Sequence, residues 1–392
     1  MTHIQWMTMA EVQEGATPSK SMGIMGLLHW NTIFILGALF IILYIINFAT
    51  VDLTSKGAGV SMILIIMSVA LLVTSADFFI EGAKGLARRA GIAEVVIGLT
   101  IVSIGTSLPE ILVTSTASYE AKTSGSVLSE LAIGNIYGSV LVQITLILGI
   151  VVLFRPLDVR PAWLKRDGLL MLLAVLLLSL FIGTGRTLSQ LEGLILVLVY
   201  ALYLAYLLRN KDKIRTEEAE ILDEVKGASE ISWTGGAYLV MVVVGLALAI
   251  YASNQLIMAA SEIAYKLNVP HAVIGSTVSG LGTSLPELTV ALMASKRSQG
   301  VAIGTLIGSN ITDPLLSIGI GALINPMTIG PEAWFLTLWI IIPATLGGVI
   351  WCIVFMWTGF KFNRKEGVGL IAFYGVFLLA LYLEHVGIIG PN

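Results

Sequence analysis

The chain of 392 residues is 56% hydrophobic and only 12% charged, a composition outside the usual range of soluble globular proteins. Its formal net charge of −3 gives no reason to expect a nucleic-acid partner. Apolar runs of about 20 residues can cross a bilayer as helices, whereas barrel strands would be about 10 residues long and would alternate polar with apolar positions. The sequence therefore predicts an all-α, polytopic protein that is integral to the lipid bilayer.

Eleven membrane-spanning segments are expected in chain order. They cover residues 32–50, 60–80, 92–119, 126–153, 168–183, 188–208, 235–258, 271–295, 300–323, 332–357 and 366–388. A long polar stretch between the sixth and seventh segments is too charged to enter lipid and is predicted to be a loop between two halves. The pattern predicts an N-terminal extension with one extra helix, a first repeat, the loop and a second repeat, at residues 1–57, 58–208, 209–232 and 233–392.

The distribution of lysine and arginine predicts how the protein is oriented in the membrane. If the 209–232 loop is cytoplasmic, 18 of the 22 basic residues lie on the cytoplasmic side. Cytoplasmic loops carry an excess of basic residues, so the N-terminus and the loop are predicted to be inside and the C-terminus outside. The apolar run at 32–50 is long for a cleaved signal and is predicted to be a retained helix, with a signal anchor as the alternative.

The hexapeptide Gly-Thr-Ser-Leu-Pro-Glu occurs twice, at Gly105–Glu110 and Gly282–Glu287, each time inside a long apolar segment. The surrounding residues 98–118 and 275–295 share 11 identities in 21 aligned positions. An ionisable side chain at bilayer depth costs several kcal/mol and marks a candidate functional site. Two such carboxylates in matching contexts predict a functional site built from an internal repeat.

The repeat extends into the following segments, where residues 132–143 resemble residues 302–313. If each half contains five core helices, an odd number, the second half must cross the membrane in the opposite sense to the first. Inverted repeats place substrate sites near the midplane, where interrupted helices from both halves meet. We therefore expect Glu110 and Glu287 to converge on one central site.

The chemistry of the motif indicates what such a site would bind. Pro109 and Pro286 lack the N–H of a helical hydrogen bond, which leaves carbonyl groups about four residues upstream without partners. Irregular backbone is tolerated at membrane depth where it lines a polar cavity. Carbonyl, hydroxyl and carboxylate groups together make an all-oxygen lining, which suits hard cations such as Na⁺ and Ca²⁺.

The partner segments add polar side chains four residues apart, a spacing that puts them on one helix face. These are Ser139 and Gln143 in the first half, and Ser309 and Asp313 in the second. Three acidic groups and several neutral oxygens fit the roughly six to eight ligands of Ca²⁺, and the lack of Cys or His near the motifs argues against zinc or copper. The cations are expected to be cargo, and no prosthetic group is expected.

Each of these features also has a purely structural interpretation. A proline-containing helix with Ser and Thr can be a simple kink, an interpretation that two copies with Glu in place make less favourable. The amide of Gln143 and the carboxylate of Asp313 could instead join helices through hydrogen bonds. The small residues of the repeat are expected to let helices approach closely rather than to bind ions; they are Gly134, Gly138, Gly304 and Gly308.

The doubled GTSLPE motif, with the GNIYGS and GTLIGSN segments that follow, resembles the α-repeats of the cation/Ca²⁺ exchanger superfamily (CaCA) and looks most like its prokaryotic Na⁺/Ca²⁺ exchangers. The resemblance covers about residues 58–388. It implies ten core helices in two inverted five-helix halves, with the first span as an extra N-terminal helix. It also implies Na⁺/Ca²⁺ antiport by alternating access in a prokaryotic cell membrane, with inorganic cations as partners and no required oligomer.

The resemblance further implies which residues would hold the ions. The central site would use Glu110, Gln143, Glu287 and Asp313. An outer Na⁺ site would use Glu110, Ser139, the Gly280 carbonyl, Thr283 and Ser284. An inner Na⁺ site would use the Ser103 carbonyl, Thr106, Ser107, Glu287 and Ser309. A Ca²⁺ ion would be held mainly by Glu110 and Glu287, with backbone oxygens of Thr106 and Thr283.

Gln143 departs from the pattern of the Na⁺/Ca²⁺ members, which usually have Asn there, and is more reminiscent of the H⁺/Ca²⁺ branch. Protons are therefore an alternative coupling ion, although the intact GTSLPE motif favours Na⁺. A cation channel is a further alternative because carboxylates can also line a pore. An enzyme is not expected, because a serine mechanism needs a base near the motif serines. The histidines are badly placed for that role: His3, His29, His271 and His385.

Overall fold

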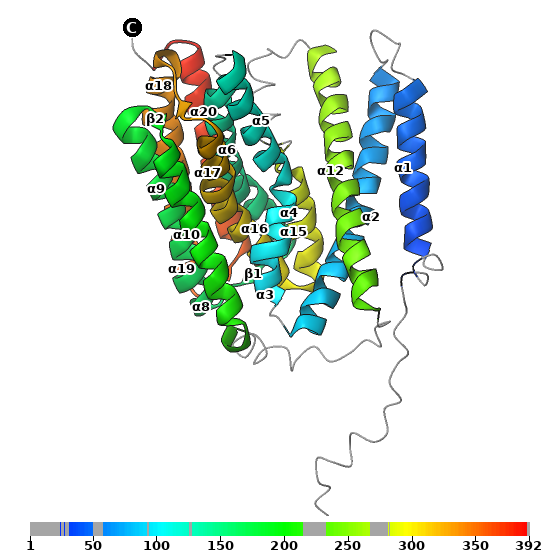
Figure 1. Ribbon diagram of the computed structural model, residues 1–392. Coiled ribbons are helices and arrows are strands. Elements are labelled where there is room, and N and C mark those ends of the chain that lie inside the picture. Colours follow the sequence, from blue (N-terminus) through cyan, green and yellow to red (C-terminus); the bar gives the residue numbers. More distant parts are fainter. Residues whose placement is uncertain are drawn as a thin grey trace, which may run out of the picture.

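The computed structural model describes residues 24, 27, 31–49, 58–91, 94–124, 128–214, 233–266, 281 and 283–389, and most of these residues are helical (Figure 1). The first half, with π-helical segments labelled η, contains α1 (Asn31–Ala49), α2 (Ala58–Ala90), α3 (Glu94–Ile97), η2 (Gly98–Val102), α4 (Ser103–Thr106), α5 (Leu108–Ser124), α6 (Leu128–Val142), η3 (Gln143–Ile147), α7 (Leu148–Phe154), β1 (Leu157–Asp158), α8 (Pro161–Trp163), η4 (Leu164–Gly168), α9 (Leu169–Gly185), β2 (Thr187–Leu188) and α10 (Gln190–Arg209). The second half contains α12 (Gly235–Lys266), α15 (Leu285–Arg297), α16 (Gln299–Thr312), η6 (Asp313–Ser317), α17 (Ile318–Ile324), β3 (Met327–Thr328), α18 (Pro331–Leu336), η7 (Thr337–Ile341), α19 (Ile342–Trp357), β4 (Lys361–Phe362) and α20 (Arg364–His385).

The predicted membrane architecture is confirmed. Within the described ranges, eight helices are long and apolar enough to cross a membrane, and a ninth span is formed if a bent helix pair is counted once. The bent pair, Val95–Thr106 and Leu108–Thr123, is the segment expected at 92–119 and turns by 44° at the first proline motif. The extra helix is α1, an apolar helix that packs against α2. The segment expected at 271–295 is described only at residue 281 and from 283 onward.

The predicted start of the fifth span was wrong because two charges within its helix neutralise each other. The span expected to begin at residue 168 begins at Pro161, seven residues earlier. The guanidinium of Arg166 donates from Nε and Nη2 to the two carboxylate oxygens of Asp167, both at 2.7 Å. The hydroxyl of Tyr203 donates a third hydrogen bond to Asp167 at 2.9 Å. Paired in this way, the charged residues continue the helix instead of ending it. The helices α2 and α12 also extend further than expected, to residues 90 and 266.

Short strand pairs join the two halves and reveal the inversion of the repeat. Strand β1 pairs antiparallel with β4, and β2 pairs antiparallel with β3. β1 and β3 are equivalent in the repeat, since each follows the helix after a π-helical segment, η3 or η6. Figure 1 shows β1 and α8 at one end of the bundle, and β2 and α18 at the other. Because β3 pairs with β2, equivalent strands lie at opposite ends, which confirms the predicted inverted topology.

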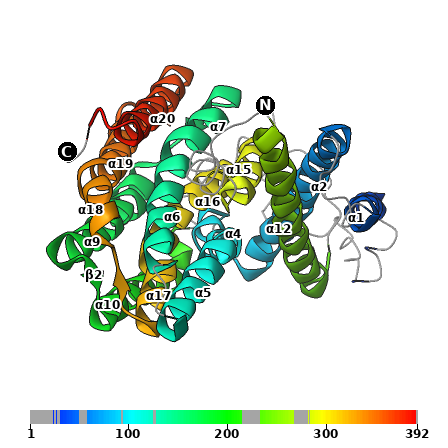
Figure 2. The same ribbon diagram turned by 90° about the horizontal axis from the view of Figure 1, so that it is seen from above.

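The repeat-related helix α16 lies in the middle of the bundle. Figure 2 shows α15 and α16 between the pair α2 and α12 on one side and α9, α19 and α20 on the other, with α1 outermost beside α2. Every residue from Gly300 to Thr312 is buried. The small side chains and the polar groups of α16 therefore face protein on all sides, which is where membrane proteins place polar side chains.

Close helix contact explains two of the four glycines of the repeat. A Cβ atom at Gly304 would lie 2.7 Å from the carbonyl oxygen of Val95 and 3.0 Å from the Cα atom of Gly98. A Cβ atom at Gly308 would lie 2.7 Å from the Cβ atom of Ser103. The predicted packing role is confirmed for Gly304 and Gly308. For Gly134 and Gly138 it stays a prediction, because the repeat-related residues 275–280 lie outside the described ranges.

Replacing Asp167 by asparagine is expected to lower the free energy of unfolding by about 3 kcal/mol, because Arg166 loses its bidentate carboxylate where little water reaches it. The two side chains are 1% and 13% exposed. Asp158→Asn is the matched control, since Asp158 and Lys361 form a pair whose side chains are 59% and 54% exposed. That change should cost at most about 0.5 kcal/mol. Denaturant titration in detergent measures both, and equal losses would contradict the buried-pair argument.

Candidate functional site

The first hexapeptide breaks the helix and starts a new one. Helix α4 ends at Thr106, and Ser107 lies in the bridge region, with φ −79° and ψ 2°. Helix α5 follows, with Pro109 in its first turn, where a missing N–H is tolerated. Glu110 is therefore in the first turn of α5. The N–H groups and the dipole of a helix start favour a negative charge at that place.

The second hexapeptide repeats this geometry. Ser284, with φ −91° and ψ 5°, precedes α15, and Pro286 again lies in the first helical turn. Glu287 is the acidic residue of that turn. Where the structure describes both hexapeptides, they form the same local structure, a helix break at the serine followed by a carboxylate at the start of a helix.

Three acidic side chains form a buried layer. Glu110, Glu287 and Asp313 are all 0% exposed. They are near enough for their charges to interact, and none of them forms an ion pair with a basic side chain among the described residues. Several oxygens of this layer accept no hydrogen bond from the described part of the chain: Glu110 Oε2, Glu287 Oε1 and Oε2, Asp313 Oδ1 and Gln143 Oε1. A buried oxygen that accepts no hydrogen bond is unfavourable unless a cation satisfies it instead.

Residues of both halves meet beside Glu110. Ser139 on α6 donates from Oγ to Glu110 Oε1 at 3.5 Å. The same Oγ lies 3.3 Å from Oγ1 of Thr283, which belongs to the second hexapeptide. Thr283 also lies beside the Glu110 carboxylate. The structure thus brings together Glu110, Ser139 and Thr283, three residues predicted to share one site.

The inverted counterpart lies beside Glu287. Oγ1 of Thr106, in the first hexapeptide, is 3.3 Å from Oγ of Ser309 on α16. Thr106 also lies beside the Glu287 carboxylate, although it makes no well-formed hydrogen bond with it. Thr106 and Ser309 relate to Glu287 as Thr283 and Ser139 relate to Glu110. The hydroxyl groups beside the two glutamates therefore make equivalent contacts in the two halves.

Gln143 and Asp313 meet between these two clusters. Nε2 of Gln143 donates to Oδ2 of Asp313 at 3.4 Å and to Oγ of Ser284 at 3.5 Å. Ser107 also lies beside Asp313. Gln143 begins η3 and Asp313 begins η6, so each side chain projects from a π-helical turn. Such turns are frequent at functional sites because they change the direction of the side chains.

Two backbone carbonyl groups were expected to bind Na⁺, and the structure describes only that of Ser103. The carbonyl of Ser103 accepts hydrogen bonds from the N–H of Ser107 at 2.9 Å and from Oγ1 of Thr106 at 3.3 Å, so it is not bare in this structure. The reason is that Pro109 removes only the helical bond to Gly105, two residues further along. Gly280, whose carbonyl was also expected to contribute, lies outside the described residues.

Acidic side chains alone do not make a compact metal centre here. In the described part of the chain, no three carboxylate, imidazole or thiolate groups are close enough to hold one metal ion by themselves. Cations at this layer would therefore need hydroxyl, amide and backbone oxygens in addition to the carboxylates. Mixed oxygen ligands of this kind are what Na⁺ and Ca²⁺ accept.

Two residues of the polar layer were missed by the sequence analysis. Oγ1 of Thr312 is 2.9 Å from Oγ of Ser103 and 3.1 Å from the hydroxyl of Tyr200 on α10. These contacts connect α10 to the helix that carries Thr106. The available signals were a hydroxyl directly before Asp313 and a tyrosine in the middle of an apolar span, and neither is specific without the packing.

A bundle of membrane-spanning helices, built from two inverted repeats around a buried acidic layer, defines the architecture of a secondary transporter. A sequence profile described as sodium/calcium exchanger protein matches residues 60–209 and 237–383. The chain belongs to the sodium/calcium exchanger family, which is a family of transporters.

Individual relatives agree with this assignment. The chain is 30% identical over 355 residues to the sodium/calcium exchanger MaX1 of Methanosarcina acetivorans, and the matched region covers 82% of this chain and 99% of that protein. It is 33% identical over 274 residues to the inner membrane protein YrbG of Escherichia coli, covering 69% and 82%. The solved structure of the sodium-calcium exchanger NCX_Mj matches with a TM-score of 0.66 at 27% identity, covering 82% of this chain and 98% of that one. Cation/Ca²⁺ antiport is therefore the general activity of this integral membrane protein.

Proposed function

We propose that this protein is a secondary antiporter that couples Na⁺ influx to Ca²⁺ extrusion by alternating access. The observation that carries the proposal is the buried layer of Glu110, Glu287 and Asp313, which has no basic partner among the described residues. An uncompensated carboxylate layer is unfavourable in a state closed to both sides of the membrane. Cations must therefore enter before the protein changes its direction of access, and the two ions compete for the same oxygens. Exchange then becomes obligatory.

The ligand roles follow the two clusters of hydroxyl groups. Ca²⁺ is held mainly by Glu110 and Glu287, with backbone oxygens of Thr106 and Thr283. The contact of Ser139 and Thr283 near Glu110 supports an outer Na⁺ site, to which Ser284 and the Gly280 carbonyl contribute. The inner Na⁺ site groups the matching side chains around Glu287: Thr106, Ser107 and Ser309.

The proposed orientation has the N-terminus and the 209–232 loop in the cytoplasm and the C-terminus outside. The pairing of β1 with β4 supports it, because it puts the basic segments around Arg160 and Lys365 at the same end of the bundle. That end has the excess of positive charge typical of the cytoplasmic side. We further propose that the chain is divided into the four regions expected from its sequence, at residues 1–57, 58–208, 209–232 and 233–392.

Separate ion gradients test the coupling. In proteoliposomes of the purified protein, an imposed Na⁺ gradient is expected to drive uptake of radioactive Ca²⁺, whereas K⁺ and pH gradients of equal size should not. The physical reason is that desolvated Na⁺ competes with Ca²⁺ for the same oxygen ligands. Ca²⁺ flux that follows the pH gradient and ignores Na⁺ would replace Na⁺ by H⁺ as the coupling ion. Currents far above carrier turnover would instead indicate a channel.

A further inference from the structure

Two pairs of hydroxyl groups join α4 to α16. Oγ1 of Thr106 lies 3.3 Å from Oγ of Ser309, and Oγ of Ser103 lies 2.9 Å from Oγ1 of Thr312. Ser103 and Thr106 are three residues apart on α4, as are Ser309 and Thr312 on α16, so the pairs share one face of each helix. All four side chains are 0% exposed. The pair beside Glu287 is therefore next to a second pair, about one helical turn away.

Tyr200 connects the second pair to a third helix. Its hydroxyl lies 3.1 Å from Oγ1 of Thr312, and its side chain is 2% exposed near the middle of α10. The direction of the hydrogen bonds follows from the other end of the chain of hydroxyls. Oγ of Ser103 donates its one hydrogen to the carbonyl oxygen of Leu99 at 3.1 Å, so it must accept from Thr312. Thr312 must then accept from Tyr200, which starts a continuous chain of hydrogen bonds.

Ser103 connects this chain of hydrogen bonds to the inner cluster through its backbone. Its carbonyl oxygen accepts from Oγ1 of Thr106 at 3.3 Å and from the N–H of Ser107 at 2.9 Å. Thr106 and Ser107 are the two residues of the first hexapeptide that the inner Na⁺ site is proposed to use. A shift of Ser103 would therefore move both of them.

The outer cluster has no second pair of this kind. The alignment of the repeats places Gly280 at the position of Ser103 and Val142 at that of Thr312. Neither glycine nor valine has a polar side chain, so these two positions cannot be joined by a hydroxyl–hydroxyl bond. The inner and outer clusters therefore match in their first pair and differ in their second.

A tyrosine is nevertheless present in both halves. Capping boxes begin α10 at Ser189 and α20 at Asn363, and they align the two helices. This alignment places Tyr374 at the position of Tyr200. Because the aligned neighbour is Val142, Tyr374 has no matching threonine hydroxyl to bind. The tyrosine hydroxyl can thus reinforce the cluster of one half and not that of the other.

We propose that Tyr200 is a positioning residue for the inner Na⁺ site and acts through Thr312 and Ser103. The role rests on the proposed function, which assigns a Na⁺ site to this cluster. Ligands that are held in place bind more tightly, because less ordering is required on binding. Ca²⁺ is held mainly by the carboxylates of Glu110 and Glu287, so its affinity depends less on these hydroxyl groups. The two Na⁺ sites are then unequal, and the inner one is the more firmly positioned.

Removing the hydroxyl of Tyr200 tests the proposal. Tyr200→Phe should raise the Na⁺ concentration for half-maximal Ca²⁺ uptake about five-fold, as for one lost hydrogen bond, and should change Ca²⁺ affinity less than about two-fold. Thr312→Val should have the same effect, whereas Thr312→Ser keeps a hydroxyl and should keep the wild-type value. Because both residues act in one chain of hydrogen bonds, the losses in the double variant Tyr200→Phe and Thr312→Val should not add. Proteoliposome flux and Ca²⁺ titration of the purified protein measure the two affinities.

Tyr374→Phe is the first matched control. It makes the same chemical change at the repeat-related position and should keep the wild-type dependence on both ions. An equal rise in the Na⁺ requirement of this variant would contradict the inequality of the two sites.

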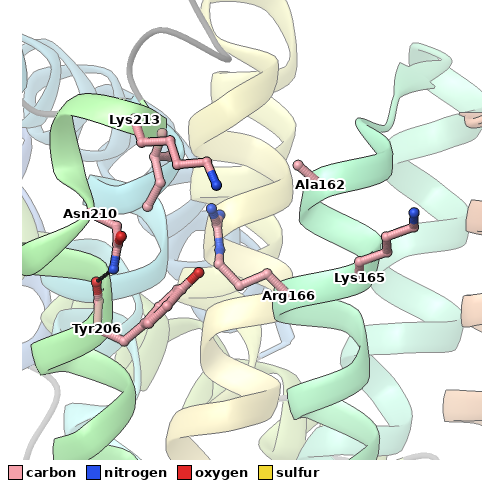
Figure 3. Close-up of a pocket in the computed structure, with 7 residues that line it drawn as sticks. Ala162, Lys165, Arg166, Tyr206, Asn210 and Lys213 are labelled. Carbon is pink, nitrogen blue, oxygen red and sulfur yellow. Dashed lines mark hydrogen bonds between the residues drawn. The ribbon is translucent and has the colours of Figure 1, made fainter.

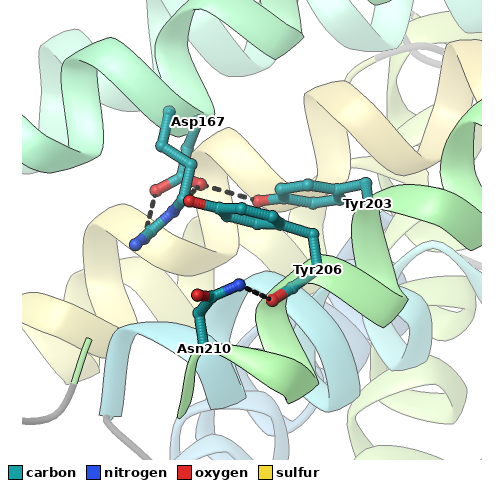
Figure 4. A network of polar contacts seen from close by, with 5 residues as sticks. Asp167, Tyr203, Tyr206 and Asn210 are labelled. Carbon is teal, nitrogen blue, oxygen red and sulfur yellow. Dashed lines mark hydrogen bonds and ion pairs between the residues drawn. The ribbon is translucent and has the colours of Figure 1, made fainter. Parts of the chain in front are cut away.

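Tyr203→Phe is the second control, on α10 itself. Its hydroxyl donates to Asp167 at 2.9 Å instead of to the hydroxyls beside the acidic layer (Figure 4). Further along α10, Tyr206 and Asn210 line a pocket at the end of the bundle (Figure 3). Tyr203→Phe loses a buried hydrogen bond as Tyr200→Phe does, so it should lower the unfolding temperature without changing the Na⁺ requirement.

The outcomes separate this role from the proposed function. If wild-type flux is driven by Na⁺ and Tyr200→Phe has the same Na⁺ requirement, only the role of Tyr200 is overturned. An equal rise in Tyr203→Phe would also overturn it, since the effect would then follow from stability. Wild-type Ca²⁺ flux that ignores Na⁺ would contradict the proposed coupling ion and the role of Tyr200 with it.

Discussion

Replacing Glu110 by glutamine is expected to abolish Na⁺-driven Ca²⁺ flux, with a loss of about 100-fold or more. The change preserves the size of the side chain and its position in the first turn of α5, but removes a charge that balances the bound cation. Losing one member of a buried charge pair costs about 3–5 kcal/mol, which is a factor of at least 100. Uptake of radioactive Ca²⁺ into proteoliposomes under a Na⁺ gradient measures the effect.

The second repeat offers an equivalent variant, and α5 itself offers a control position. Glu287→Gln should cause the same loss, because Glu287 has the same place in α15 and the same burial. Glu120→Gln makes the same chemical change on the exposed part of α5 and should leave flux unchanged. Wild-type flux in Glu110→Gln or Glu287→Gln would refute the assignment of the site.

The fold could be predicted from the sequence where its determinants are local or repeated. Apolar length gave the spans, and the duplicated hexapeptide with an odd number of helices per half predicted the inversion that the β1–β4 and β2–β3 pairs confirm. The break at Pro109 could also be predicted, because proline cannot continue a helical ladder at that point. These features depend on residues close together in the chain.

Features that depend on a distant partner were not predictable. The start of the span at Pro161 depends on Asp167 receiving hydrogen bonds from Arg166 and Tyr203, the latter on another helix. The π-helical turns at Gln143 and Asp313 require an extra residue per turn, which no residue type specifies. Hydrophobic runs show which segments enter the membrane, but the pairing of their polar groups is determined by packing.

The same distinction applies to the candidate site. The family resemblance implied that Thr283 would share a site with Ser139 of the first half, and the structure places their hydroxyl groups 3.3 Å apart. The link from Tyr200 through Thr312 to Ser103 was not expected, because it depends on how α10 packs against α16. The hexapeptides are identical, whereas Gln143 and Asp313 differ, so the inverted halves contribute unequal charges at the centre. Because of this asymmetry, flux measurements are needed to identify the coupling ion.

Gly308→Ala is expected to reduce exchange by about ten-fold or more while the protein still reaches the membrane. An added Cβ atom would lie 2.7 Å from Cβ of Ser103 and 2.9 Å from Cα of Leu99, both closer than real Cβ contacts allow. Helices α4 and α16 would then have to separate by several tenths of an ångström. Overpacking of this kind costs about 1–3 kcal/mol. Thr106, which lies on α4 opposite Ser309, would move away from the inner cluster.

Flux, Ca²⁺ binding and the unfolding temperature of Gly308→Ala should be measured together. They separate a change at the cation site from a loss of overall stability. Gly375→Ala makes the same change at an exposed helical position with no described atom within 4 Å, and should keep full activity. We expect Gly308→Ala to lose Ca²⁺ affinity as well as flux, because Thr106 and Ser309 must stay in contact to complete the ligands of Glu287. Normal flux in Gly308→Ala would mean that α4 and α16 can separate without loss, and that the small residues of the repeat do not position the cation site.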